Sequence, residues 1–454
     1  MLMTSRLSRN FSIGRLPRIA LFVLTALAQT STSRAAAEQP TQPSAVTKAP
    51  DSASKWIDAW ATSFLPTLRN GALDAVPTFS NQTLRLVVFS KLAGTQARVR
   101  FTNKFQTTPL KIGAAHVALR AGTRGGAITS DTDRALTFDG KPSVTIAPGE
   151  ELWSDPVKLD VPQHADVAIS VFLPDEDYKP TAIHQTGLKT SYLSAPGDHT
   201  GEATMPAPTI SGRGQGAVGP GGGGGRWRGM GGDGTTNLVY FVNDLQVMAP
   251  ANTKVIVAFG DSITDGAVSQ NDGNAAWPEM LSKRLPKLPD GTPVSVINMG
   301  IGSNRIVASD QAGPAGVKRF ADDVLARPNV THIIVLEGVN DISYEHETPE
   351  HLIAAYQDLI TRAHAKGIKV YGSPILPIQN SNKDTPANEA TRQAVNKWIK
   401  TSKAFDAVID FEHAVQDPAN PLRIRSNLTG GDYVHPNTAG YKAMADAIDL
   451  KLFE

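Results

Sequence analysis

The pattern of apolar residues changes once along this chain of 454 residues, near Pro250. Between residues 56 and 250, short alternating or β-rich stretches are separated by Gly, Pro and Asp. Beyond residue 250, apolar stretches of strand length alternate with stretches of helical period. Regularly spaced strands favour an antiparallel sandwich, whereas strand and helix in alternation are typical of a parallel sheet with crossover helices. A chain of this length exceeds one ordinary core, so we predict two domains.

The two patterns give specific expected elements. The first domain should contain strands at 83–89, 97–102, 143–146, 157–161, 167–173 and 238–247. The second should contain strands at 254–259, 293–298, 332–336 and 369–372, and helices at 277–285, 349–366, 387–402 and 438–452. We therefore place an antiparallel β-sandwich domain at 54–250 and an α/β domain at 251–454.

The amino-terminal residues have the three regions of an export signal. Four arginines precede the apolar run 19–28, and three alanines at 35–37 offer small residues for cleavage. The apolar run is short for a membrane span, so a signal peptide at 1–37 is favoured over an uncleaved anchor. Residues 38–53 are rich in Pro, Ser, Thr and Ala and are predicted to be a disordered lead-in. We expect a secreted or periplasmic protein without a membrane span in its mature form.

A Gly-rich segment interrupts the first domain at 212–234. No Gly-Lys-Ser/Thr follows it, so a phosphate-binding loop is not supported, and a flexible surface insertion is the main interpretation. A polymer-contacting loop carried by Trp227 is the alternative.

The charge balance and the cysteine count narrow the chemistry. The formal net charge is +1, with 44 basic and 43 acidic residues, which gives no reason to expect a nucleic-acid partner. The chain has no cysteine, which excludes disulfides, a thiol nucleophile and cysteine-bound metal. We expect no metal and no other cofactor.

Three side chains together could form a nucleophilic relay. Ser262 lies in Gly-Asp-Ser-Ile-Thr-Asp-Gly, directly after an apolar stretch, and Asp432 and His435 lie in Asp-Tyr-Val-His-Pro before the last expected helix. A serine needs a histidine to take its proton and an acid to orient that histidine. Acid and base three residues apart can be presented by one short loop. In open α/β sheets such groups gather beyond the carboxyl ends of the strands, where Ser262 is expected.

These segments resemble the four sequence blocks of the SGNH/GDSL hydrolase family. The blocks are residues 260–266, the segment 298–304 (Asn-Met-Gly-Ile-Gly-Ser-Asn), the segment 338–341 (Gly-Val-Asn-Asp) and residues 432–436. The resemblance covers about residues 252–454 and implies a three-layer α/β/α, flavodoxin-like fold with esterase or acylhydrolase activity. The β-rich half is more loosely similar to the leading domain of exported bacterial members related to xylanase-associated acetylesterases.

The resemblance assigns roles to individual residues. Ser262 is similar to the family's nucleophile, His435 to its base and Asp432 to its orienting acid. The oxyanion donors would be the backbone N–H of Ser262, one N–H from Gly302 or Ser303, and the Asn340 side chain. Ser303 stands where the family has a second glycine, and it would be strained if that position requires a positive φ. Ile263 replaces the family's commonest leucine, a conservative change.

Each motif also has a structural interpretation that remains open at this point. Ser262 could be a helix cap, Asn340 could belong to a turn, and Asp432 with His435 could be a loop cap and a surface histidine. The pairs at 346–347 and 350–351 bring His and Glu together, but the spacing is not His-Glu-x-x-His. An α/β-hydrolase is disfavoured because Thr264 replaces the second glycine of Gly-x-Ser-x-Gly.

Three functions follow as hypotheses. The first is a secreted serine esterase that removes short acyl groups, acetyl above all, from plant-type polysaccharide or oligosaccharide through an acyl-enzyme. The second is a lipase or arylesterase with the same mechanism. The third is a glycan-binding protein with a degenerate esterase domain. The expected partner is thus an ester substrate, with acetylated polysaccharide as the candidate.

Overall fold

The computed structural model describes residues 53–66, 76–208, 233–309 and 313–454. The predicted signal peptide, nearly all of the lead-in and most of the Gly-rich segment, including Trp227, lie outside these ranges. All of the described residues belong to one compact unit, Ser52–Glu454. Below, residues 53–250 are the β-rich part and residues 251–454 the α/β part.

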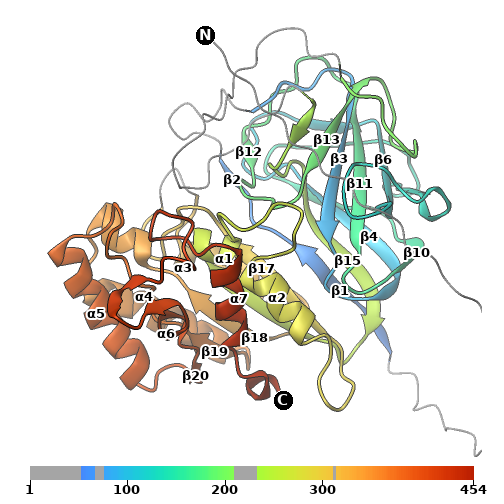
Figure 1. Cartoon of the computed structure of the whole chain (residues 1–454). Helices are drawn as coiled ribbons and strands as arrows, with labels where there is room; N and C mark the ends of the chain where they lie inside the picture. Colours follow the sequence, from blue (N-terminus) through green and yellow to red (C-terminus); the bar gives the residue numbers. More distant parts are fainter. Residues whose placement is uncertain (1–52, 67–75, 209–232, 310–312) are drawn as a thin grey trace, which may run out of the picture. The chain divides into compact units, whose positions relative to one another are not determined.

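The β-rich part consists of antiparallel sheets (Figure 1). One sheet has the order β1 (Ser54–Ala61), β15 (Val242–Pro250), β4 (Gly94–Thr102) and β10 (Val157–Val161), with β9 (Glu151–Trp153) also paired to β4. The other has the order β14 (Thr235–Thr236), β13 (Ser191–Pro196), β3 (Gln82–Phe89), β11 (Asp166–Leu173), β6 (Ala114–Leu119) and β7 (Arg134–Ala135). Two small pairs are β2 (Leu65–Pro66) with β12 (Ala182–Ile183) and β5 (Leu110–Ile112) with β8 (Val144–Ile146), and a short 3-10 turn is η2 (Ser130–Thr132). The predicted antiparallel β-sandwich is confirmed.

One strand of the β-rich part begins later than predicted. We expected a strand at 238–247, but β15 spans Val242–Pro250. Phe241 has a φ of 59°, in the left-handed region, so the chain cannot enter the ladder before residue 242.

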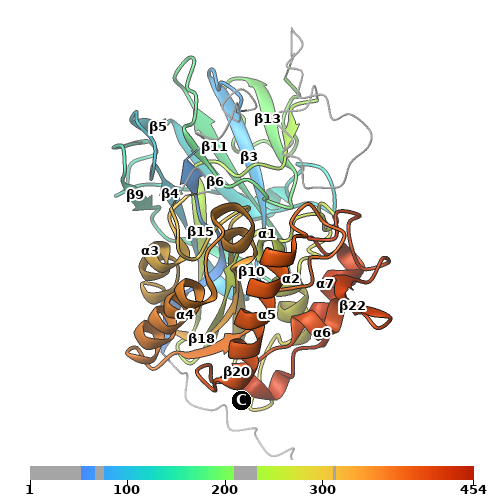
Figure 2. The same ribbon diagram turned by 90° about the vertical axis from the view of Figure 1, so that its left-hand side faces the viewer.

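The α/β part is built on one parallel sheet, as predicted. The strand order is β17 (Val294–Gly300), β16 (Lys254–Gly260), β18 (Val330–Leu336), β19 (Lys369–Gly372) and β20 (Ala407–Val408). Every pairing in it is parallel. In chain order the sheet reads 2-1-3-4-5, the doubly wound order of flavodoxin-like folds. Its first strand, β16, is buried along almost all of its length because helices cover both faces (Figure 2).

The helices form two groups on the two faces of this sheet (Figures 1 and 2). One group is α2 (Trp277–Arg284), α6 (Phe411–Val415) and α7 (Thr438–Asp446). The other is α3 (Gly316–Phe320), α4 (Pro349–His364) and α5 (Pro386–Thr401). The remaining elements are α1 (Ser262–Asp265), the π-turns η3 (Ala321–Leu325) and η4 (Asp341–Glu345), the hairpin β21 (Gln416–Asp417) and β22 (Asn420–Ile424), and the 3-10 turn η5 (Leu450–Phe453).

Caps explain where several helices begin and end. The side chain of Thr348 accepts a hydrogen bond from the N–H of His351, and a proline starts α4 just after it. The expected last helix ends at Asp446 rather than at 452. Asp449 accepts from the N–H of Lys451 and thereby caps a separate 3-10 turn, so the periodic pattern continues although the α-helix does not.

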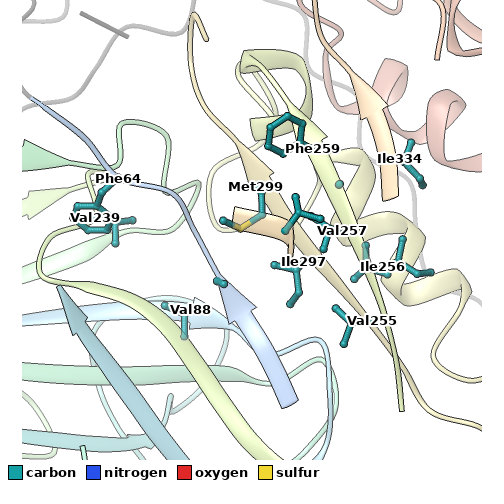
Figure 3. Close-up of a cluster of buried hydrophobic side chains, with 14 of the residues drawn as sticks. Phe64, Val88, Val239, Val255, Ile256, Val257, Phe259, Ile297, Met299 and Ile334 are labelled. Carbon is teal, nitrogen blue, oxygen red and sulfur yellow. The ribbon is translucent and has the colours of Figure 1, made fainter. Parts of the chain in front are cut away.

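One hydrophobic cluster runs through both parts of the compact unit. Phe64 and Val239 of the β-rich part belong to the same cluster as Ile297 and Met299 of β17 (Figure 3). Strand β1 contacts β17, and the Ser295 hydroxyl donates a 2.6 Å hydrogen bond to a backbone carbonyl of β1. Within the described ranges, no helix is both long and apolar enough to cross a membrane.

Candidate active site

Ser262 lies at the first position of α1, directly after the carboxyl end of β16. The side chain of Asp261 accepts a 2.9 Å hydrogen bond from the Ile263 N–H and so caps this short helix. The helix lies close to the end of β17: a Cβ on Gly300 would be 2.1 Å from the Asp265 nitrogen. Only glycine permits this approach, which brings the first two sequence blocks together.

A continuous chain of hydrogen bonds joins Ser262, His435 and Asp432. Ser262 Oγ lies 2.8 Å from His435 Nε2, and His435 Nδ1 lies 2.6 Å from Asp432 Oδ2. The three sequence-predicted residues therefore meet, although 173 positions separate the serine from the histidine. The His435 and Asp432 side chains are 17% and 18% exposed, so both are largely but not completely buried.

The loop around Asp432 holds its carboxylate in the ionised form. The second oxygen, Oδ1, accepts from the backbone N–H groups of Val434 and His435, each at 2.9 Å. Burial favours the neutral acid, but the hydrogen bonds and positive charge of His435 and the two backbone bonds outweigh it and lower the pKa of Asp432 to about 2. An ionised Asp432 accepts the proton on Nδ1, which leaves Nε2 as the acceptor for the Ser262 hydroxyl.

The second and third blocks also meet. Asn340 is 3% exposed and its Nδ2 donates to the backbone carbonyl of Asn304 at 2.9 Å. Gly302 is buried, and a Cβ there would lie 3.9 Å from Asp265 Oδ2, so this segment faces α1. All of the predicted oxyanion residues thus lie in the blocks that surround α1.

Ser303 has the strained conformation that the sequence left undecided. Its φ is 64°, in the left-handed region, whereas Gly302 beside it does not have a positive φ. The family's glycine would adopt this φ without cost, and a serine there carries about 1–2 kcal/mol of strain. Asn304, which follows it, is held on both sides: its backbone carbonyl accepts from Asn340 Nδ2, and its own Nδ2 donates to the Pro314 carbonyl.

Sequence reasoning missed a buried arginine beneath the blocks. Arg319 donates to the backbone carbonyls of Gly260 and Met299, each at 2.8 Å, and to Asn304 Oδ1 at 2.7 Å. These partners lie at the ends of β16 and β17 and in the second block. Arg319 thus ties the ends of two strands to the block, and the sequence around it carries no signal because its partners are distant along the chain.

A histidine of the β-rich part contacts the helix that carries Ser262. His184 Nε2 lies 3.2 Å from Asp265 Oδ1, and both side chains are almost fully buried. The ring is held from its other side, since Nδ1 lies 2.9 Å from the Ser63 carbonyl. Asp265 belongs to the first block, so the motif marked it, but nothing in the sequence paired it with His184.

Buried carboxylates surround the site. Burial raises the pKa of Asp261 to about 6, opposed by the Ile263 N–H and by the positive charges of His435 and Lys383. Burial likewise raises the pKa of Asp341 to about 6, opposed by hydrogen bonds from the N–H groups of Val307 and Ile306. The described part of the chain holds no group of three or more His, Cys, Asp or Glu side chains arranged to bind a metal ion. The exposed His351 instead pairs with Glu347 at 2.7 Å.

One protein family matches most of the α/β part. Residues 258–443 match the GDSL-like lipase/acylhydrolase family. A search of curated proteins found no match.

Solved structures with partial similarity include three esterases or lipolytic proteins. A member of the lipolytic G-D-S-L family from Veillonella parvula is 22% identical, with a TM-score of 0.32, over 43% of this chain and 95% of its own. The aryl esterase of M. smegmatis is 18% identical, with a TM-score of 0.35, over 43% and 95%. A carbohydrate acetylesterase family member from Sinorhizobium meliloti is 15% identical, with a TM-score of 0.36, over 44% and 97%.

The family match covers the helix α1 that begins at Ser262, the second and third blocks, and the loop that presents Asp432 and His435. The α/β part therefore carries a GDSL-like lipase/acylhydrolase domain, and the protein is a carboxylic ester hydrolase.

Proposed function

We propose that the protein is a serine esterase in which Ser262 is the nucleophile, His435 the general base and Asp432 the residue that orients it. The observation that carries this proposal is the unbroken hydrogen-bond chain, 2.8 Å from serine to histidine and 2.6 Å from histidine to aspartate. Ser262 Oγ attacks the ester carbonyl carbon while its proton moves to His435 Nε2. The alcohol leaves with that proton, and a water then hydrolyses the acyl-enzyme by the same transfer.

The negative oxygen formed by this attack needs donors that are already in place. We assign this role to the backbone N–H of Ser262, one N–H of the Gly302–Ser303 segment and the Asn340 side chain. Support comes from the buried position of Asn340 and from its bond to the second block. Removing one donor of this kind typically lowers kcat by about 100- to 1,000-fold.

The proposed substrate is a short acyl ester, acetyl above all, on plant-type polysaccharide or oligosaccharide. It rests on the loose sequence resemblance of the β-rich half to the leading domain of exported bacterial members related to xylanase-associated acetylesterases. The arginines, apolar run and alanines of residues 1–37 support export, which would bring the enzyme to such a polymer.

Point variants test the relay. Ser262→Ala should abolish hydrolysis of p-nitrophenyl acetate without changing the circular dichroism spectrum. Asp432→Asn should lower kcat strongly, by up to about 10⁴-fold, with little change in KM, because the amide favours the wrong histidine tautomer. Full activity of the serine variant would remove Ser262 as the nucleophile.

A chain-length series tests the substrate. Rates on p-nitrophenyl esters from acetyl to decanoyl should fall with acyl length, and acetate should be released from acetylated xylan. A preference for long chains would replace the polysaccharide hypothesis by a lipase. Binding of xylan without any acetate release would favour a glycan-binding protein.

A further inference from the structure

A buried lysine lies behind the candidate oxyanion donor. Lys383 belongs to the loop between β19 and α5 and is 5% exposed. Its Nζ donates to Asn340 Oδ1 at 3.1 Å and to Ser343 Oγ at 2.7 Å, and it lies 4.0 Å from the centre of the Tyr344 ring. Burying an ammonium group is costly unless its partners compensate, so its location here requires an explanation.

The neighbours of Asn340 fix which way its amide points. An ammonium group only donates hydrogen bonds, so the atom of Asn340 that faces Lys383 must be the carbonyl oxygen. A backbone carbonyl only accepts, so the atom that faces Asn304 must be the NH₂ group. Both neighbours require the same orientation. One hydrogen of that NH₂ group is used on Asn304. In the proposed function, the other is donated to the oxyanion.

The lysine itself is held in place by the helix that follows it. The Asn388 side chain, in the first turn of α5, donates to the Lys383 backbone carbonyl at 2.8 Å. Ser343, which accepts from the ammonium, in turn donates to the Val339 carbonyl at 2.7 Å. The contact between Lys383 and Asn340 is therefore part of a fixed network. The charge also reaches the nucleophile's segment, since it acts to lower the pKa of Asp261, the residue before Ser262.

We propose that Lys383 is a positioning residue of the oxyanion hole, which orients the Asn340 amide and makes it a stronger donor. A positive charge on the carbonyl end of an amide draws electron density from its NH₂ group and strengthens the bond which that group donates. The effect grows when the substrate oxygen becomes negative, so it acts on the transition state more than on the bound ester. This inference rests on the proposed function, in which Asn340 donates to the oxyanion.

A double-mutant cycle on p-nitrophenyl acetate tests the inference. Lys383→Met should lower kcat by roughly 10- to 100-fold with KM almost unchanged, a fraction of what loss of the donor itself costs. In an Asn340→Ala background the same change should have little further effect, because the group it acts through is gone. Equal losses in both backgrounds, or an unchanged kcat, would overturn the proposal.

Two further variants keep the result interpretable. Lys383→Gln retains a hydrogen-bond donor of similar length without the charge, so it should keep more activity than Lys383→Met. If the methionine variant does not fold, the glutamine variant takes its place in the cycle. Lys254→Met is the matched control. Lys254 begins β16, at the end of the strand away from Ser262, and its Nζ donates to the Phe453 carbonyl, so the free energy of unfolding should fall while kcat stays unchanged. A Ser262→Ala variant that keeps its activity would refute the proposed function instead, so the two failures are distinguishable.

Discussion

At the residue scale, the Ser262–His435–Asp432 relay is held by two local segments: the loop that contains Asp432 and His435, and the end of β16. Two backbone N–H groups and the imidazole surround Asp432, which keeps the carboxylate ionised across the neutral range. This explains why Asp432 and His435 can lie three positions apart: the loop that presents His435, the proposed base, also donates two hydrogen bonds to Asp432. The oxyanion side is different, because its groups come from separate strand ends and depend on packing.

Ser303 gives a prediction at this scale. Ser303→Gly should raise the free energy of unfolding by about 0.5–1 kcal/mol, because the φ of 64° strains serine and not glycine. Urea unfolding followed by fluorescence measures this change. Ser303→Val should move the midpoint in the opposite direction, since a β-branched residue tolerates this region poorly. Equal midpoints for the three proteins would contradict the strain argument.

At the element scale, the four-residue helix α1 depends on its cap. Asp261 is buried, accepts from the Ile263 N–H, and has a folded-state pKa of about 6 against an ordinary value of 3.8. A carboxyl group with a raised pKa binds its proton more tightly in the folded state than in the unfolded one. Stability from this group is therefore present at low pH and is lost as the pH rises from about 4 through 6.

An amide at this position should remove that pH dependence. Asp261→Asn keeps a side-chain oxygen for the cap but does not titrate. The free energy of unfolding of the wild type should fall relative to that of Asp261→Asn by roughly 2 kcal/mol between pH 4 and pH 7. Urea unfolding at pH 4, 5, 6 and 7 measures the difference, and a constant offset would contradict the assignment to this group.

At the scale of the whole molecule, a buried ion cluster joins the β-rich and α/β parts. Arg327 lies 2.9 Å from both Asp58 of β1 and Asp244 of β15, and none of the three side chains is more than 5% exposed. Burial and the neighbouring Asp58 raise the pKa of Asp244 to about 7, although Arg327 and Arg100 act to lower it. The cluster is balanced only while the two parts remain together.

Removal of the arginine should therefore destabilise the whole unit. Arg327→Met should cost about 3–5 kcal/mol, because Asp58 and Asp244 stay buried without the cation that bridges them, and only Arg100, 3.3 Å from Asp244, remains as a positive partner. A matched control is Arg423→Met. Arg423 pairs with Asp417, but its side chain is 35% exposed, so its loss should lower the free energy of unfolding by less than about 1 kcal/mol. Denaturant unfolding of the two variants measures these changes. Similar losses in the free energy of unfolding would contradict the claim that the buried cluster stabilises the unit more than a surface ion pair does.

The sequence by itself determined what depends on local pattern. The change of periodicity near Pro250 separated antiparallel from parallel strands, and the four blocks located Ser262, Asn340, Asp432 and His435, because alternation and motif spacing are written along the chain. Boundaries such as Phe241 and Asp449 depended on a backbone angle and a cap that patterns do not encode.

Only the tertiary structure decided how these pieces support one another. Lys383 behind Asn340, Arg319 under the strand ends, His184 against Asp265 and the left-handed φ of Ser303 all arise from contacts between residues that are distant in sequence or from the backbone such contacts impose. A buried charge is stable only where its partners converge. That convergence depends on how the chain packs, so it cannot be predicted from a local sequence pattern.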